Sequence, residues 1–154
     1  MRKTSNKIKK WEERFQGKLE KRHKHFAKNV FHRLMKKSST LKQSLKRRAK
    51  EYEVEFEITL DEVRDMLLRF YSTPCRYCKR PMDITNIVCD HISPLSNGGG
   101  SVVNNLQMIC SSCNTRKGNL SHSDYSKLIN WLKGQSCDMK SYVLRKLAKG
   151  DNFN

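Results

Sequence analysis

Two Cys-x-x-Cys pairs, Cys75-Arg-Tyr-Cys78 and Cys110-Ser-Ser-Cys113, enclose the stretch that decides the fold: Ile87-Val-Cys-Asp90-His91-Ile-Ser-Pro94-Leu, the Gly98-Gly-Gly100 loop and Asn104-Asn105-Leu-Gln107. A Cys-x-x-Cys turn lets two thiolates reach one ion at about 2.3 Å, and two such turns complete a closed tetrahedral zinc site. We therefore predict a structural Zn²⁺ bound by Cys75, Cys78, Cys110 and Cys113, which staples a small core. A pair of redox dithiols is the alternative, although neither pair lies in a strand-to-helix context of the thioredoxin kind.

The residues between the cysteine pairs predict two strands. Apolar runs at 87–92 and 106–109 indicate short strands, and the glycine-containing loop joins them as a long hairpin. A helix is expected to begin around Cys113. The sequence therefore predicts an α+β fold whose centre is a two-strand, one-helix unit clamped at its outer ends by zinc.

The segment before Cys75 predicts one more strand and a helix. Residues 51–58 alternate glutamate with larger side chains, the pattern of a half-buried strand. Thr59 stands three residues before Glu62, which is the spacing of a capping box, so we predict a helix over 60–71. The side chains expected on the buried face of the strand are Tyr52, Val54, Phe56 and Ile58.

The positive charge of the chain is concentrated at its beginning. Residues 1–50 hold 19 Lys+Arg and 3 Asp+Glu, whereas residues 51–154 hold 13 and 12, so nearly all of the net charge of +17 lies in the first third. Such a polybasic arm is suited to neutralising the phosphates of a nucleic acid, and a solubilising tail is the alternative. We divide the chain into a basic helical DNA-binding arm, 1–50, and a zinc-stapled domain with C-terminal helices, 51–154. The DNA-binding candidates of the arm are Lys42, Lys46, Arg47, Arg48 and Lys50.

The arm is expected to be helical. Its apolar residues recur at steps of three, four or seven, as one stripe on a helix would. Ser38-Ser39-Thr40 interrupts this stripe and predicts a break, followed by a second helix over 41–50. The aromatic residues Trp11, Phe15, Phe26 and Phe31 either pack internally or contact nucleic acid. Because its like charges repel one another, the arm is expected to order fully only on its polyanion. The stripe consists of Ile8, Trp11, Phe15, Leu19, Phe26, Val30 and Leu34.

Two further helical patterns occupy the C-terminal part, and no membrane segment is expected. Tyr125, Leu128, Ile129 and Leu132 form one pattern and Met139, Tyr142, Val143 and Leu147 the other, and we interpret both as core. The chain has no apolar run long enough for a bilayer and no apolar stretch behind its charged start. We therefore expect a cytoplasmic protein without a membrane partner.

In its motifs the sequence resembles the HNH endonucleases, the ββα-metal nucleases, in the form with two Cys-x-x-Cys pairs often seen in phage and mobile-intron enzymes. The resemblance runs through Cys75-x-x-Cys78, Asp90-His91-Ile-x-Pro94-Leu, the glycine loop, Asn105-Leu-Gln107 and Cys110-x-x-Cys113-Asn114-x-x-Lys117, and covers roughly residues 45–125. It implies a small HNH core around the zinc site, with the helical basic arm before it and helices after it. Asp90 stands for the first letter of the family pattern, and Asn114 stands where many members carry a final His.

The chemistry of phosphodiester hydrolysis assigns roles to these residues. His91 can be the general base, because its ordinary pKa near 6.5 leaves it mostly neutral, and Asn105 can fix its ring orientation. Asp90 and Asn114 offer hard oxygen ligands to Mg²⁺ or Mn²⁺. Strict alternation sends Asp90 and His91 to opposite faces of a strand, so both serve one site only near the end of that strand. Two positive side chains, Lys117 and Arg116, are candidates for phosphate contact, and the resemblance supports Lys117.

The resemblance thus implies a metal-dependent HNH endonuclease that hydrolyses double-stranded DNA, as a nicking or double-strand enzyme, with a homing-type enzyme of a phage or intron as one setting. In a phage its location would be the host cytoplasm. One site cuts one strand, so a double-strand break requires a homodimer, a second encounter or a partner protein. The alternatives are a non-catalytic zinc-stabilised DNA- or RNA-binding module and an enzyme that cleaves RNA. None of the other histidines is assigned to chemistry, namely His23, His25, His32 and His122.

Overall fold

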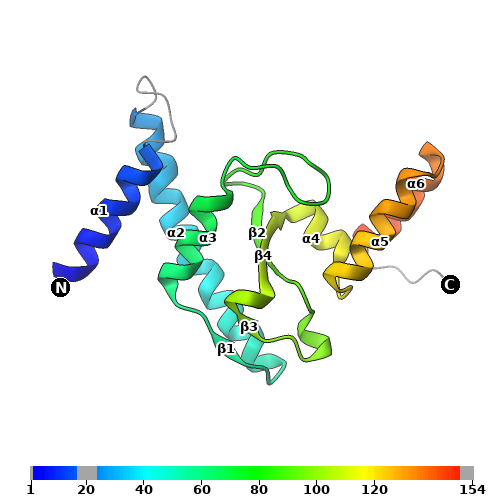
Figure 1. The fold of residues 1–154 in the computed structure, drawn as a ribbon, viewed down its shortest axis with the longest axis horizontal. Helices are drawn as coiled ribbons and strands as arrows, with labels where there is room; N and C mark the ends of the chain where they lie inside the picture. Colours follow the sequence, from blue (N-terminus) through cyan, green and yellow to red (C-terminus); the bar gives the residue numbers. More distant parts are fainter. Residues whose placement is uncertain (1, 17–23, 150–154) are drawn as a thin grey trace.

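The centre of the fold is a strand hairpin followed by a helix. The computed structural model describes residues 2–16 and 24–149. Strands β2 (Ile87–His91) and β4 (Leu106–Cys110) pair antiparallel, and β4 leads directly into α4 (Ser111–Lys117), which packs on both strands (Figure 1). The predicted two-strand, one-helix unit is confirmed, and its helix begins two residues earlier than expected.

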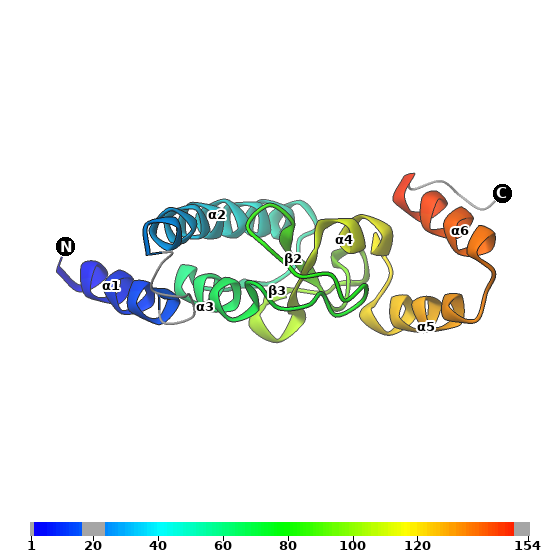
Figure 2. The same cartoon turned by 90° about the horizontal axis from the view of Figure 1, so that it is seen from above.

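Three N-terminal helices form one end of the molecule. They are α1 (Arg2–Gln16), α2 (Lys24–Glu51) and α3 (Leu60–Phe70), and α2 and α3 lie side by side in both views (Figures 1 and 2). Trp11 and Phe15 of α1 are buried in the same hydrophobic core as Phe31 of α2 and Leu67 of α3. Of the two alternatives for the aromatic stripe, internal packing is therefore the one observed. Leu19 and the side chain of Phe26 lie outside the described residues.

The predicted break at residues 38–40 is wrong, because α2 continues through it. The hydroxyl of Ser38 donates to the carbonyl oxygen of Met35 at 2.6 Å, and that of Thr40 donates to Lys36 at 3.3 Å. A hydroxyl that bonds back to the preceding turn is satisfied inside the helix and need not end it. The side chain of Ser38 is fully buried against the core, so tertiary packing holds this turn in place.

The segment after α2 is less strand-like than its alternation predicts. Only β1 (Phe56–Glu57) is a strand, because α2 extends to Glu51 and Glu53 adopts a positive φ of 52°. Tyr52 is exposed, whereas Ile58 is buried as expected. Strand β1 pairs in parallel with β3 (Ser101–Val102), so this segment holds the connection between β2 and β4. The predicted helix is confirmed as α3, with the complete Thr59–Glu62 capping box.

The connection between β2 and β4 is folded tightly. It contains two short 3-10 turns, η2 (Leu95–Asn97) and η3 (Val103–Asn105), on either side of β3. A Cβ atom added to Gly99 would come within 2.1 Å of the carbonyl oxygen of Ser93, so no larger residue fits there without a shift of the backbone.

Helices α5 (His122–Lys133) and α6 (Cys137–Lys149) form the other end of the molecule (Figure 2). Tyr125, Leu132 and Val143 are buried as predicted, but the prediction is wrong for Met139 and Tyr142, which are exposed because α6 turns that face to solvent. Within residues 2–16 and 24–149, none of the helices combines the length and the apolar character that crossing a bilayer requires.

Candidate functional site

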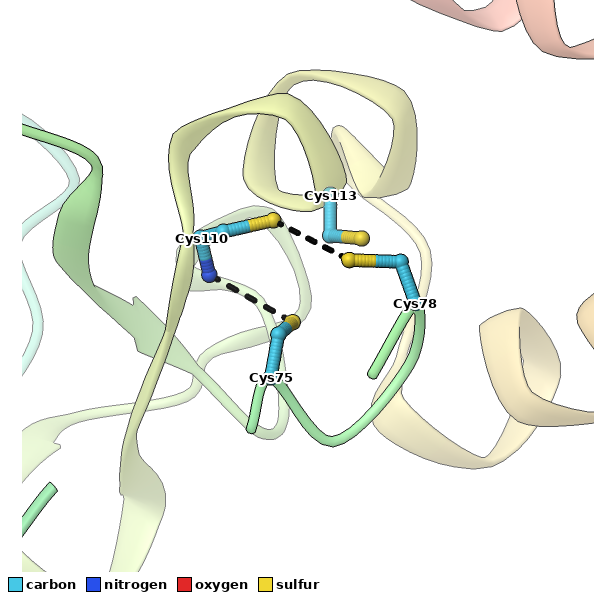
Figure 3. Close-up of side chains that lie close together, drawn as sticks. All are labelled: Cys75, Cys78, Cys110 and Cys113. Carbon is cyan, nitrogen blue, oxygen red and sulfur yellow. Dashed lines mark hydrogen bonds between the residues drawn. The ribbon is translucent and has the colours of Figure 1, made fainter. Parts of the chain in front are cut away.

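The four cysteines of the two Cys-x-x-Cys pairs meet at one point. Cys75 and Cys78 come from the turn after α3, Cys110 from the end of β4 and Cys113 from the first turn of α4 (Figure 3). Their sulfur atoms all lie within 4.8 Å of one another, and those of Cys78 and Cys110 are 3.6 Å apart. A tetrahedral zinc with sulfur ligands at about 2.3 Å requires sulfur separations of about 3.8 Å, so the cluster fits Zn²⁺ closely.

The surroundings of Cys75 favour the thiolate that a metal needs. A hydrogen bond from the Cys113 thiol, together with backbone N–H groups that include that of Cys110 at 3.5 Å, lowers the pKa of Cys75 to about 4. Such backbone donors are the usual partners of zinc-bound sulfur and orient the ligand. All four candidate ligands come from the protein, which is the arrangement of a structural zinc site.

A separate pocket of about 280 Å³ gathers four of the predicted nuclease residues. We call it the Asp90 pocket. The end of β2 contributes Asp90 and His91, and α4 contributes Asn114 and Lys117. Both strand residues line this pocket because β2 ends at His91, as the alternation argument required. The remaining lining residues are Arg48, Tyr52, Pro94, Leu95, Ser96, Thr115, Gly118 and Asn119.

Asp90 is held by two donors. Its Oδ2 accepts from Nε2 of Gln107 at 2.9 Å and lies 3.1 Å from Nζ of Lys117, whose distance to Oδ1 is 3.2 Å. Lys117 also donates to the carbonyl oxygen of His91 at 2.9 Å, and only 2% of this lysine is exposed. The structure therefore places Lys117 beneath the carboxylate and not at the surface where a phosphate contact was expected.

The carboxylate retains room for a cation. Oδ1 of Asp90 accepts from Lys117 alone among the residues that the structure describes, and a carboxylate oxygen has two lone pairs. Asn114 lines the same pocket, is half-buried and offers an amide oxygen. One carboxylate and one amide in an open polar pocket suit a hard ion such as Mg²⁺ or Mn²⁺, which keeps several water ligands.

His91 is neutral in this environment. Burial, followed by the positive charges of Arg48 and Lys117, lowers the pKa of His91 to about 4. Its Nε2 lies 2.9 Å from the hydroxyl oxygen of Ser101, which is itself buried in β3. When Nε2 carries the proton and donates to Ser101, the lone pair of Nδ1 is free to accept a proton.

The expected contact between Asn105 and the ring of His91 is wrong. The amide of Asn105 is committed to the loop: Oδ1 accepts from the backbone N–H of Ser93, and Nδ2 donates to the carbonyl oxygens of Ser93 and Gly100. Both donors are thus used on backbone oxygens. Asn105 therefore holds the connection that carries Ser101, and Ser101 contacts the ring.

The arm candidates for DNA contact are dispersed. Arg48 reaches the Asp90 pocket, whereas Lys46, Arg47 and Lys50 are exposed along α2. Lys42 lines a second hollow beside β1. Arg116 lines a third, which Tyr77 and Tyr125 share, and so does not face the Asp90 pocket.

Sequence reasoning missed several residues that complete the site. Ser101 contacts His91, and Gln107 contacts Asp90. The Asn-Leu-Gln run marks Gln107 as part of the motif, but no spacing rule assigns it a partner, because its partners come from another strand and a distant turn. Tyr77 and His122, whose side chains lie 2.7 Å apart, likewise have no sequence signal.

Comparisons with known proteins give a family match, which spans the zinc-ligand candidates and most of the residues that line the Asp90 pocket. The family model described as HNH endonuclease matches residues 75–120, so the resemblance is confirmed for this segment. No curated protein matches the sequence. Among solved structures, the chain is similar to the crystal structure of the Type II-C Cas9 enzyme from Actinomyces naeslundii, with a TM-score of 0.38 and 21% identity. That similarity covers 74% of this chain and 13% of the Cas9 chain.

Proposed function

We propose that this chain, whose residues 75–120 match the HNH endonuclease family, is a metal-dependent endonuclease that hydrolyses phosphodiester bonds of double-stranded DNA. One observation carries the proposal: a buried carboxylate, a neutral imidazole and an amide oxygen line a single open pocket, as Asp90, His91 and Asn114 do. A protein that only binds nucleic acid has no need for a base beside hard metal ligands.

The mechanism follows from the groups in the Asp90 pocket. His91, oriented by Ser101, accepts the proton of the attacking water through its free ring nitrogen. Asp90 and Asn114 would hold the divalent cation, which when bound would supply neutralising charge for the phosphate and the departing 3′ oxygen. Lys117 pairs with the carboxylate at 3.1 Å and holds its orientation, so its role is indirect. Cleavage then leaves 5′-phosphate and 3′-hydroxyl ends.

The basic arm supplies affinity for the duplex in this proposal. Lys46, Arg47 and Lys50 lie on the exposed part of α2 that ends at the Asp90 pocket, where Arg48 enters it. Contacts between these side chains and backbone phosphates position the DNA without reading its sequence. In this proposal the arm, 1–50, binds DNA and the domain 51–154 cleaves it. Lys42 and Arg116 are further phosphate contacts.

The biological setting is part of the proposal. A zinc-stapled HNH chain with a basic arm suits a homing-type enzyme of a phage or mobile intron, which acts in the cytoplasm of the host cell. The chain has one nuclease pocket of this kind among its described residues, so we infer that it nicks one strand. A double-strand break would require a homodimer or a partner protein.

The test is cleavage of supercoiled plasmid by zinc-loaded protein with Mg²⁺ or Mn²⁺. Native protein should convert the plasmid to open circles, and His91→Ala should lose at least a hundredfold in rate while retaining its DNA affinity. His32→Ala is the matched control, because His32 is an exposed histidine of α2 that bonds only within its own helix. Equal rates for native protein and His91→Ala would contradict the proposal, and faster cleavage of an RNA substrate would reassign it.

A non-catalytic zinc-stabilised DNA- or RNA-binding module is the second candidate. The observation in its favour is the ion pair between Asp90 and Lys117, since a buried lysine neutralises this carboxylate without any metal. Tight binding of plasmid and of genomic DNA, with no cleavage of either in the presence of Mg²⁺ or Mn²⁺, would support this candidate.

A further inference from the structure

We propose that Gln107 is a positioning residue that couples the zinc knuckle, by which we mean the Cys75–Cys78 turn, to the Asp90 carboxylate. The inference rests on the proposed function, because Asp90 is there a ligand of the catalytic ion. Gln107 lies opposite Asp90 in the β2–β4 register, and only 7% of it is exposed. Its side chain links Asp90 to two residues that lie between the zinc ligands Cys75 and Cys78.

The orientation of the Gln107 amide is determined by its neighbours. Nη1 of Arg76 donates to Oε1 of Gln107 at 3.3 Å, and a guanidinium group cannot accept a hydrogen bond. Oε1 must therefore face Arg76, which leaves Nε2 as the donor on the other side. Nε2 donates to the carboxylate of Asp90 at 2.9 Å and to the hydroxyl oxygen of Tyr77 at 3.1 Å. Every polar atom of this side chain is engaged.

Tyr77 is in turn held on its far side. Because its hydroxyl oxygen accepts from Gln107, its proton is directed to Nδ1 of His122, 2.7 Å away. The ring of Tyr77 also packs edge-on against that of Tyr125, with centroids 4.7 Å apart. Arg76 and Tyr77 are the two residues between Cys75 and Cys78, so their directions follow the shape of this turn, which a zinc ion bound by the two cysteines would hold.

The consequence for the Asp90 pocket is a preference for one carboxylate orientation. Gln107 donates to Oδ2 alone and Lys117 lies near both oxygens, so Oδ1, which accepts only from Lys117 among the described residues, keeps a lone pair to meet a cation. Loss of an outer partner of this kind typically weakens metal affinity by about 10- to 100-fold. A zinc ion bound at the Cys75–Cys78 turn would therefore also influence the affinity of the second metal site, through Arg76, Tyr77 and Gln107.

The experiment measures Mn²⁺ binding to zinc-loaded protein by isothermal titration calorimetry, without DNA. Gln107→Leu should raise the Kd for Mn²⁺ by about 10- to 100-fold, with zinc content and circular dichroism unchanged. Gln43→Leu is the matched control, since Gln43 is an exposed glutamine on α2. A Kd for Gln107→Leu within twofold of the native value would overturn the inference, because a merely structural role lowers stability without changing Mn²⁺ affinity in the folded state.

A second variant keeps the test decisive if Gln107→Leu does not fold. Tyr77→Phe removes only the hydroxyl that accepts from Gln107, and it should weaken Mn²⁺ binding several-fold. An unchanged Kd in Tyr77→Phe would then overturn the inference. Asp90→Asn separates the two proposals. If native protein and Asp90→Asn bind Mn²⁺ with equal affinity, the metal site of the proposed function fails. If Asp90→Asn loses Mn²⁺ affinity while Gln107→Leu and Tyr77→Phe retain it, only the coupling is refuted.

Discussion

Arg48 offers the sharpest test of how the arm contributes to cleavage. This residue lines the Asp90 pocket, and its Nε is buried without a hydrogen-bond partner in the described part of the chain. The neighbouring Arg47 differs in exposure and in pairing, because 72% of its side chain is exposed and it pairs with Glu51 at 3.4 Å. We expect Arg48 to donate to a phosphate of the bound DNA at the reacting centre and Arg47 to contact only the distant backbone.

The expected magnitudes follow from these environments. A charge-assisted hydrogen bond in a shielded site contributes about 1.5 to 3 kcal/mol, so Arg48→Gln should slow cleavage by about 10- to 150-fold. An exposed, already paired arginine contributes about 0 to 1 kcal/mol, so Arg47→Gln should change the rate less than about fivefold. Because Arg48 leaves a buried donor unpaired in the free protein, Arg48→Gln should not lower the thermal midpoint.

The assay is single-turnover cleavage of a duplex by saturating zinc-loaded protein with Mg²⁺, with thermal midpoints measured in parallel. Saturation removes differences in DNA affinity, so the rate constant reports contacts made in the reaction. Arg48→Lys keeps the charge without the planar fork of guanidinium donors and should fall between the native protein and Arg48→Gln. Equal rates for Arg48→Gln and Arg47→Gln, both with native stability, would refute the reasoning.

Three further predictions concern stability. Removing zinc with a strong chelator should abolish the cooperative thermal transition, because the four cysteines clamp the hairpin to α4, and a metal-free protein that melts like the native one would contradict this. Folding lowers the pKa of His91 from 6.5 to about 4, so the unfolded chain binds this proton at a higher pH than the folded protein does. Between pH 6.5 and 4 the free energy of unfolding of native protein, measured by urea titration, should therefore fall by up to about 3 kcal/mol more than that of His91→Asn. In the same titration, Ser38→Pro should lower the free energy of unfolding by about 3 kcal/mol or more and Ser38→Ala by less than about 1 kcal/mol, because α2 is continuous through residue 38. Equal losses for the two variants would instead support a helix break at residues 38–40.

Local patterns in the sequence were sufficient for the centre of the fold. The apolar runs on either side of the glycine loop predicted β2 and β4, and the Thr59–Glu62 spacing predicted the start of α3, because each depends on neighbours a few residues away. The Cys-x-x-Cys turns predicted the sulfur cluster for the same reason, since each turn brings its two thiolates together by itself.

Local patterns misled wherever packing opposed them. Ser38 and Thr40 have low helix propensity, yet their hydroxyls bond back to α2 and the buried face of this helix continues past them. The alternating glutamates predicted a long strand, but α2 extends to Glu51 and only Phe56–Glu57 pairs with another strand. A strand needs a neighbouring strand, and that neighbour lies far along the chain.

The sequence by itself determined which chemical groups the protein has and which of them share a motif: the two Cys-x-x-Cys pairs, Asp90 beside His91, and Asn114 four residues after Cys110. Only the tertiary structure decided which side chain serves which. In the folded protein Ser101, and not Asn105, contacts the ring of His91, and Lys117 is buried beside Asp90. Gln107 contacts Arg76 of the zinc knuckle, and Arg48 of the arm lines the Asp90 pocket. These contacts join residues that are far apart in sequence, and their geometry is set by the packing of whole elements, which no local spacing encodes.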